Sequence, residues 1–433
     1  MMRKRSARPA RWVIAASAIA ALLVASACST KSNGGSDQTK AGAGGVKEGP
    51  GVTDTTITLG ALTDESGVFA LLGTTVSQGA QLYFDQLNKN GGVCNRKIVI
   101  NLKDGGYDVD KSVAFYKGMH NDVLGMEQLL GSPINAALKQ NIEDDQMFTI
   151  PVSWASTILD NPNNMIVGTT YDLEIINGIS FLMDKGVIKK GDTIGHIYLE
   201  GEYGEDGYLG SQFAAKELGL KLVGEQIQAT ATDLTTQVTA LKNKGAKAIL
   251  LTTTPAQTAS AAGVDASIGL NAPLLGNNPT YAPQLLATPA APALEALLYV
   301  AASFEPFSGT SSGATAARKA YLAKYGGPKV VPNGGSTWGW GAAAAYTAVL
   351  KQACADKDLT RAGLQKAFRE TTNIDTGGIL PALDYSSPGD PPTREALIAK
   401  PDKNAQGGLT VVQPLKASDI ANKYVAPEHG KGG

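Results

Sequence analysis

The chain has 433 residues, with 38 Lys plus Arg against 39 Asp plus Glu, and its formal net charge is -1. This length predicts two or three domains, since one hydrophobic core serves about 150 residues. The balanced charge argues against a nucleic-acid-binding protein, which needs a basic face for its phosphate contacts.

The first segment of the chain has the features of an export signal. Basic residues fill much of 3–11, and an apolar stretch follows from Trp12 to Ala27, too short for a comfortable membrane span. The next residue, Cys28, completes a pattern that resembles the bacterial lipobox, which predicts diacylation and a membrane anchor. Cleavage by ordinary signal peptidase near Ala27 is the alternative. Residues 28–52, rich in Gly, Ser, Lys and Thr, predict a flexible tether.

Strands and helices alternate over the next hundred residues. Strands are expected at 55–62, 97–102, 123–125 and 147–152, and helices at 76–90, 110–121 and 135–145. This alternation predicts an α/β fold with a parallel, doubly wound sheet. Ligands bind beyond the carboxyl ends of such strands, so we expect the loops at 64–73, 131–132 and 153–156 to share one edge.

Gly131 and Ser132 stand at the start of the third predicted helix. Ser132 suits the N-cap position, Pro133 suits the first turn, and Gly131 lets a ligand approach the backbone. A helix start presents free N–H groups and a partial positive charge, which hold a carboxylate or another anion. An ordinary capped helix that binds nothing is the alternative from this stretch alone.

The alternation begins again in the second half of the chain. Strands are expected at 193–199, 221–227, 248–251 and 273–276, and helices at 209–218, 234–244 and 255–268. Further helices are expected at 315–325, 340–354 and 360–370, before a loop-rich tail with one strand at 409–412. Two similar α/β units in one exported chain predict two lobes that face each other across a cleft.

Only Cys94 and Cys354 remain after Cys28. A leftover pair in an exported protein predicts a disulfide, with two buried free thiols as the alternative. The sequence has no GxSxG, HExxH or GxxxxGK[ST] motif and only three scattered histidines. We therefore expect no catalytic residues, no metal site and no cofactor, and a hydrolytic enzyme is the least favoured function.

The order of these features resembles the branched-chain amino acid binding proteins, which have the type I periplasmic binding fold of ABC importers. The resemblance spans about 53–415 and is carried by 60–63, 66–67, 88–93, 96–98, Asp104, 131–132, 150–153, 203–205 and the helix at 340–348. It implies two Rossmann-like lobes joined by three crossing segments. Lobe one would comprise 53–172 and 304–380, and lobe two 173–303 and 381–425, with a disordered C-terminus at 426–433. Cys94 and Cys354 would then share a lobe.

The resemblance also implies a function and a binding site. The protein would be a monomeric substrate-binding lipoprotein on the outer face of the cell membrane, working with ABC permease and ATPase subunits. A ligand-sensing lipoprotein that acts on a signalling receptor is the alternative. The expected ligand-binding residues are Gly131, Ser132, Ser153, Trp154, Tyr203, Thr254, Asn278 and Trp338.

The expected ligand is a small polar or carboxylate-bearing solute, such as an amino acid, an amide or an aromatic acid. Ser132 and Ser153 would hold its carboxylate, and Tyr203 would close over it from lobe two. Asn277 or Asn278 stands where the family usually carries an acid for the ligand's ammonium. This departure argues against an α-amino acid, because a buried ammonium without a counter-charge is costly.

Overall fold

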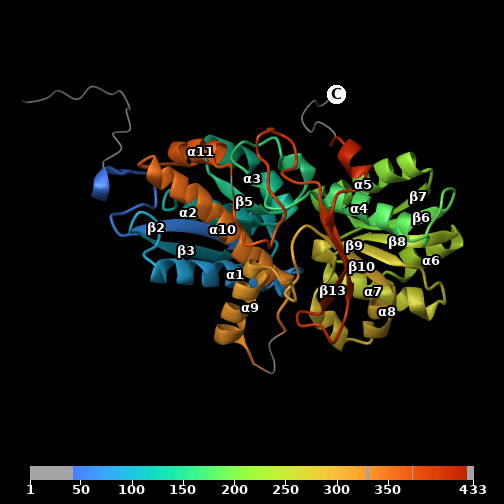
Figure 1. Cartoon of the computed structure of the whole chain (residues 1–433). Coiled ribbons are helices and arrows are strands. Elements are labelled where there is room, and N and C mark those ends of the chain that lie inside the picture. The colour runs from blue at the N-terminus through green and yellow to red at the C-terminus, as the bar shows by residue number, and fades with distance from the viewer. Residues whose placement is uncertain (1–41, 328–330, 373, 427–433) are drawn as a thin grey trace, which may run out of the picture. The chain divides into compact units, whose positions relative to one another are not determined.

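The computed structural model describes residues 42–327, 331–372 and 374–426. Two sheets organise this part of the chain (Figure 1), and their strand orders are β3-β2-β4-β5 and β13-β12-β10-β9-β8-β6-β7. The first is wholly parallel and comprises β2 Thr56–Thr63, β3 Lys97–Asp104, β4 Met126–Leu130 and β5 Thr149–Val152. The second comprises β6 Thr193–Leu199, β7 Lys221–Ile227, β8 Ala246–Thr252, β9 Leu274–Asn277, β10 Leu298–Ala302, β12 Ala396–Pro401 and β13 Leu409–Lys416.

In the second sheet β12 runs antiparallel to both of its neighbours, β10 and β13, and all other neighbouring strands are parallel. The α/β class with doubly wound lobes, predicted from the alternating pattern, is confirmed.

Helices cover both faces of the first sheet. On one face α1 packs against α10, next to α9 and α11, and on the other α2 packs against α3. Their bounds are α1 Ala70–Lys89, α2 Val109–Met119, α3 Ser132–Asp144, α9 Ser312–Tyr325, α10 Gly334–Ala355 and α11 Arg361–Glu370. Glycines bring α1 and α10 close together, because a Cβ on Gly79 would collide with the carbonyl oxygen of Ser336, and one on Gly339 with that of Val76.

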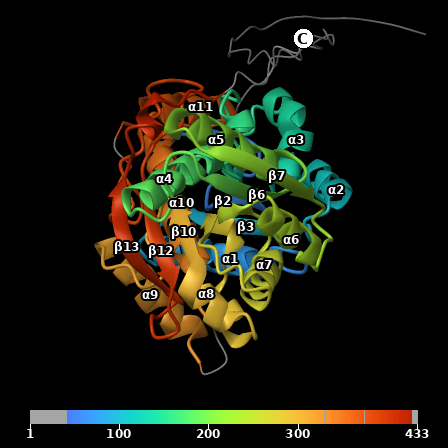
Figure 2. The same ribbon diagram turned by 90° about the vertical axis from the view of Figure 1, so that its right-hand side faces the viewer.

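The second sheet is covered in the same way. Figure 2 shows α4 and α5 above its strands and α6, α7 and α8 below them. Their bounds are α4 Tyr171–Asp184, α5 Glu202–Leu218, α6 Thr235–Asn243, α7 Pro255–Ser267 and α8 Ala291–Leu297. None of the described helices is long and apolar enough to cross a membrane.

The chain passes between the lobes three times, from β5 to α4, from β10 to α9 and from α11 to β12. Thr169 joins the three crossing segments directly. Its backbone N–H donates to the hydroxyl of Ser303 at 3.0 Å, and its own hydroxyl donates to the carbonyl of Thr393 at 2.8 Å. These bonds make the crossing segments one connected hinge.

Several predicted elements are wrong. The strand expected at 123–125 is β4 at Met126–Leu130, because the polar pair Glu127-Gln128 lies buried inside it and interrupts the apolar pattern. The helix α4 was not predicted, since its residues are buried on all sides and show no amphipathic period. The strand β12 was also missed, α1 begins inside the loop predicted at 64–73, and α5 begins at Glu202, before the helix predicted at 209–218.

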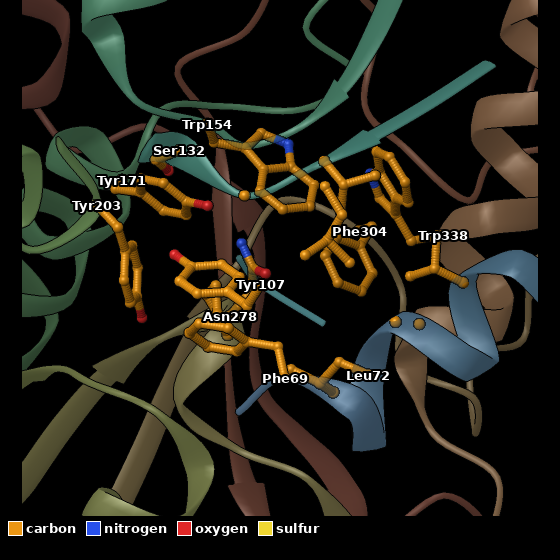
Figure 3. A pocket seen from close by; sticks show the side chains of 17 residues that line it. Phe69, Leu72, Tyr107, Ser132, Trp154, Tyr171, Tyr203, Asn278, Phe304 and Trp338 are labelled. Carbon is orange, nitrogen blue, oxygen red and sulfur yellow. The ribbon is translucent and has the colours of Figure 1, made fainter. Parts of the chain in front are cut away.

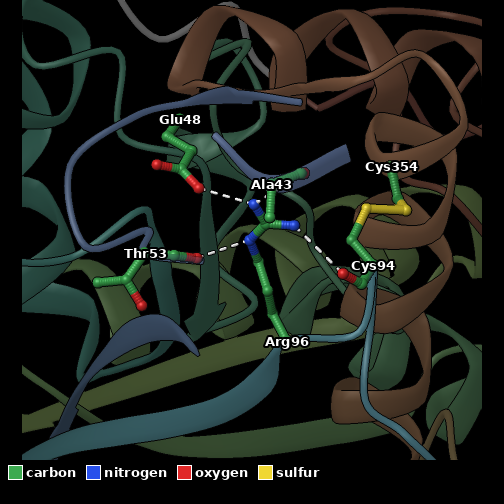
Figure 4. The surroundings of a disulfide bond; sticks show 6 residues. All are labelled: Ala43, Glu48, Thr53, Cys94, Arg96 and Cys354. Carbon is green, nitrogen blue, oxygen red and sulfur yellow. Dashed lines mark hydrogen bonds and ion pairs between the residues drawn. A yellow bond between two sulfur atoms is a disulfide. The ribbon is translucent and has the colours of Figure 1, made fainter. Parts of the chain in front are cut away.

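The N-terminal segment is packed on lobe one from residue 42 onward, so the prediction of a flexible tether is wrong for 42–52. β1 Lys47–Glu48 pairs with β11 Asp358–Leu359. The buried Arg96 holds the segment: its Nε donates to the carbonyl of Thr53 at 2.6 Å, and its Nη2 lies 2.7 Å from Glu48 Oε1 (Figure 4). The signal peptide, Cys28 and residues 427–433 lie outside the described residues.

Figure 4 also shows the disulfide between Cys94 and Cys354, whose Cα atoms are 5.8 Å apart. Cys94 precedes β3, and Cys354 lies at the end of α10, so both belong to the lobe of the first sheet. The two cysteines are 260 residues apart in sequence. The bridge therefore joins α10, where the chain has returned to lobe one, to the segment before β3.

Candidate ligand-binding site

A cavity lies beyond the carboxyl ends of β4 and β5. Its walls come from both lobes and from the crossing segments. The lining residues are Phe69, Leu72, Gly73, Val76, Tyr107, Leu130, Gly131, Ser132, Val152, Trp154, Tyr171, Tyr203, Asn278, Pro279, Phe304, Gly335 and Trp338. Most of these side chains are apolar or aromatic, and Figure 3 shows the labelled ones converging on the cavity.

Hydroxyl groups gather at one end of the cavity. The hydroxyls of Ser132 and Ser153 lie 2.7 Å apart, and Ser132 is nearly fully buried. Burial and the neighbouring Tyr107 raise the pKa of Tyr171, while a hydrogen bond with Ser132 acts in the opposite direction. Burial also raises the pKa of Tyr107, in the same direction as the nearby carboxyls of Glu202 and Asp64. Both phenols therefore stay protonated at neutral pH and act as donors.

The start of α3 lies at the same end. Gly131 is its N-cap, with φ of 108°, and Ser132 is its first residue, so the prediction of Ser132 as N-cap is wrong. A Cβ on Gly131 would lie 2.9 Å from Ile134 and 3.0 Å from the ring of Tyr107. Because the bare glycine cap carries no side chain to accept from the first turn, the free amides of α3 remain available to a ligand.

Two tryptophans form the apolar wall. The rings of Trp154 and Trp338 have centroids 5.0 Å apart. Both indole N–H groups donate to the carbonyl of Val167, at 3.1 Å and 2.8 Å respectively. Because these donors are already occupied, the rings offer the cavity only their apolar surface.

An aromatic series connects the two lobes over the cavity. Phe69 and Tyr107 of lobe one have centroids 4.8 Å apart, and Phe69 lies 5.9 Å from Tyr203 of lobe two. Tyr203 in turn lies 4.8 Å from Tyr171 at the start of α4. The hydroxyl of Tyr203 donates to Asn277 Oδ1 at 2.8 Å, so this tyrosine faces the site mainly through its ring.

Asn278 is the polar residue that lobe two presents to the cavity, whereas Asn277 lies behind it and is fully buried. The side-chain Nδ2 of Asn278 donates to both carboxyl oxygens of Glu174, at 3.0 Å and 3.1 Å, and its backbone N–H donates at 3.1 Å. Burial raises the pKa of Glu174 to about 8, despite these bonds. Glu174 is therefore mostly neutral at pH 7.

Six of the eight predicted ligand-binding residues line the cavity: Gly131, Ser132, Trp154, Tyr203, Asn278 and Trp338. Ser153 lies one layer behind and acts through its bond to Ser132. Thr254 does not line the cavity, which corrects its prediction. Its hydroxyl accepts from the N–H of Gln257 at 3.3 Å, and its own N–H donates to the Gln257 side chain at 3.0 Å, so it caps α7.

Sequence reasoning missed four aromatic residues that line the cavity: Phe69, Tyr107, Tyr171 and Phe304. Tyr107 follows two glycines directly after β3 and has φ of 60°, an uncommon conformation for a residue with a side chain. The glycine pair beyond a strand end was the available signal for Tyr107. The sequence held no such signal for Tyr171, because the helix α4, which Tyr171 starts, was not predicted.

The lining residues of this cavity include no Lys, Arg or His. Within 42–327, 331–372 and 374–426, no group of three or more His, Cys, Asp or Glu side chains is placed to hold a metal ion. The site thus combines a hydroxyl-rich end at a helix start with a large apolar remainder.

Residues 56–407 match the family model described as periplasmic binding protein. The chain belongs to this family. Its members are the substrate-binding proteins of ABC transporters with the type I periplasmic binding fold, so the predicted fold and family are confirmed. The chain is thus an extracytoplasmic substrate-binding protein of a transporter family, as distinct from an enzyme family.

Solved structures support the same assignment. A fatty acid ABC transporter substrate-binding protein from Thermomonospora curvata is 44% identical, with a TM-score of 0.86, over 89% of this chain and 98% of that chain. A branched chain amino acid ABC transporter protein from Thermus thermophilus with bound valine is 20% identical, with a TM-score of 0.73, over 87% and 99%. A solute binding protein from R. palustris in complex with benzoate is 17% identical, with a TM-score of 0.68, over 84% and 98%. A comparison with curated proteins gives no match.

Proposed function

We propose that this substrate-binding protein captures a monocarboxylic acid with an apolar body, of the fatty acid class, and delivers it to an ABC permease. The observation that carries the proposal is the division of the cavity into a hydroxyl-rich end and an apolar remainder with no cationic side chain. The 44% identical relative is named for fatty acids, and a more distant one holds benzoate, so both point to the same ligand class.

The carboxylate docks at the start of α3. The hydroxyls of Ser132, Tyr107 and Tyr171 donate to its oxygens, together with the free amides of the first helical turn. The apolar body lies on Trp154 and Trp338, where each buried methylene contributes about 0.8 kcal/mol. The ligand contacts both lobes at once, so it stabilises the closed arrangement that the permease recognises.

An α-amino acid fits this site poorly. Asn278 occupies the lobe-two position facing the cavity and brings no charge, and the nearest carboxyl behind it, Glu174, is mostly neutral at pH 7. A buried ammonium would therefore lack a counter-charge, which costs several kcal/mol. Among the ligands that the sequence leaves open, these features favour an acid without an amino group.

The test is a thermal-shift and calorimetric comparison on the chain that lacks residues 1–28. Octanoate, benzoate, leucine and octylamine form a matched set that separates the carboxylate, the apolar body and the ammonium. We expect octanoate, and more weakly benzoate, to raise the melting temperature, since a ligand at 100 times its Kd adds about 2.7 kcal/mol. Stabilisation by leucine or octylamine in preference to octanoate would refute the assignment.

We also propose that a diacylated Cys28 anchors the protein to the outer face of the membrane. The support is the sequence pattern at the end of the signal peptide. Full-length wild type is expected in the detergent-extracted membrane fraction, and Cys28→Ala in the soluble fraction. Equal release of both would contradict the anchor, and the mass of the mature N-terminal peptide provides an independent check.

A further inference from the structure

A second, smaller cavity lies next to the first, on the lobe-two side. It is formed over β10, β12 and the start of β13. The lining residues are Asn278, Val300, Ala302, Phe304, Pro306, Leu397, Ala399 and Leu409. All of them except Asn278 are apolar. The cavity therefore suits a hydrocarbon group and offers little to a polar solute.

The two cavities share two wall residues, Phe304 and Asn278. Asn278 is held in place by its three hydrogen bonds to Glu174. Trp338, further along the same wall of the main cavity, is fixed by its bond to Val167. Phe304 has no polar group, so rotation of its side chain breaks no side-chain hydrogen bond. Of these three residues, it is the one whose side chain no hydrogen bond holds in place.

The start of α10 lies close to the ring of Phe304. The nearest atoms to a Cβ placed on Gly334 would be the ring Cε2 of Phe304 at 3.2 Å and the Cα of Pro306 at 3.9 Å. Because residue 334 is glycine, it places no side chain of its own against this edge of the ring. Phe304 lies on the crossing segment after β10 and is 9% exposed.

The ring of Phe304 lies at the end of the main cavity away from the hydroxyl groups. In Figure 3 Ser132 and Tyr171 lie on one side of the cavity, whereas Phe304 and Trp338 lie on the other. An acid whose carboxylate docks at Ser132 directs its hydrocarbon end toward Phe304. The same ring also lines the second cavity.

We propose that Phe304 is a gate between the two cavities, and that the second cavity receives the distal part of a long acyl chain. This inference rests on the proposed function and deepens it, because it assigns the protein to long-chain acids and identifies the residue that sets their length. Short acids occupy the main cavity alone. A longer chain displaces the Phe304 ring and extends between it and Asn278.

The experiment measures Kd for hexanoate, octanoate, decanoate, dodecanoate and hexadecanoate by calorimetry. In the wild type, affinity should rise about fourfold per methylene while the chain enters apolar space, and should continue to rise past the length that fills the main cavity. Ala302→Leu fills the second cavity and should lower the affinity for hexadecanoate relative to hexanoate by about tenfold or more. Phe304→Ala should raise the affinity for hexadecanoate relative to hexanoate.

The control is Ala296→Leu, which makes the same substitution at an exposed position of α8 and should leave the chain-length profile unchanged. Melting temperatures of all variants, measured without ligand, report whether each one is folded. If hexanoate binds and the dependence of Kd on chain length is the same in wild type, Ala302→Leu and Phe304→Ala, the gate is overturned and the proposed function stays intact. Failure of every acid to bind wild type would overturn both.

Discussion

Glu174→Gln tests the charge state on which the ligand assignment depends. The Glu174 carboxyl is fully buried behind Asn278, and burial raises its pKa from 4.5 to about 8. Since the folded-state pKa lies above the unfolded value, Glu174 contributes stability that is fully present below pH 4.5 and is lost as pH rises through about 8. Glutamine has nearly the same shape and does not ionise.

The magnitude follows from linkage. The loss approaches 1.36 kcal/mol per pH unit between the two pKa values, so wild type loses about 2–3 kcal/mol from this group between about pH 5 and about pH 7. Glu174→Gln removes that loss. A pH-independent cost, from the altered bonds to Asn278, is the same at both pH values and cancels in the comparison. The unfolding free energy of Glu174→Gln, relative to that of wild type, should therefore be about 2–3 kcal/mol higher at about pH 7 than at about pH 5.

Urea denaturation without ligand at the two pH values measures this shift. Glu127→Gln is a matched control, because burial also raises the pKa of Glu127 to about 8 and this residue lies in β4, outside the cavity lining. It should show a similar pH effect on stability with no change in ligand selectivity. Parallel pH dependence of wild type and Glu174→Gln would mean that Glu174 is ionised in the folded protein. An ammonium-bearing ligand would then regain its counter-charge, and the argument against amino acids would fail.

Three further predictions concern the site and its scaffold. Ser132→Ala should raise the Kd for octanoate about tenfold in calorimetry at an unchanged melting temperature, because a hydroxyl donor to a carboxylate contributes about 1.5 kcal/mol; equal affinity would sink its role as the anchor. Replacing Cys94 and Cys354 by alanine should lower the free energy of unfolding by about 4 kcal/mol, since the bridge spans 260 residues; alkylation of both wild-type thiols without reductant would show that no bridge forms. Arg96→Met should release the N-terminal segment and speed tryptic cleavage at Lys47, and unchanged protection would contradict the clamp.

The sequence by itself determined the fold and identified Gly131 and Ser132, which line the cavity. Parallel strands buried on both faces leave short apolar stretches, and amphipathic helices leave a period of 3.6, so both signals are local and survive without coordinates. Gly131 and Ser132 were found because a strand, a glycine and a capped helix follow one another directly in the chain. Trp154 and Trp338 were found through the order of motifs shared with the family.

Only the tertiary structure showed which side chains meet at the cavity and which of their polar groups are already paired. Tyr107, Tyr171 and Phe304 reach the cavity from three different segments, and no local pattern signals that they converge. Thr254 shows the converse: its position suggested a ligand contact, but it caps a helix. The neutrality of Glu174 and the bond of both tryptophans to Val167 arise from burial and from contacts between distant segments. These contacts leave a site with one polar end and an apolar body, because charge and donor satisfaction depend on what surrounds a residue in space.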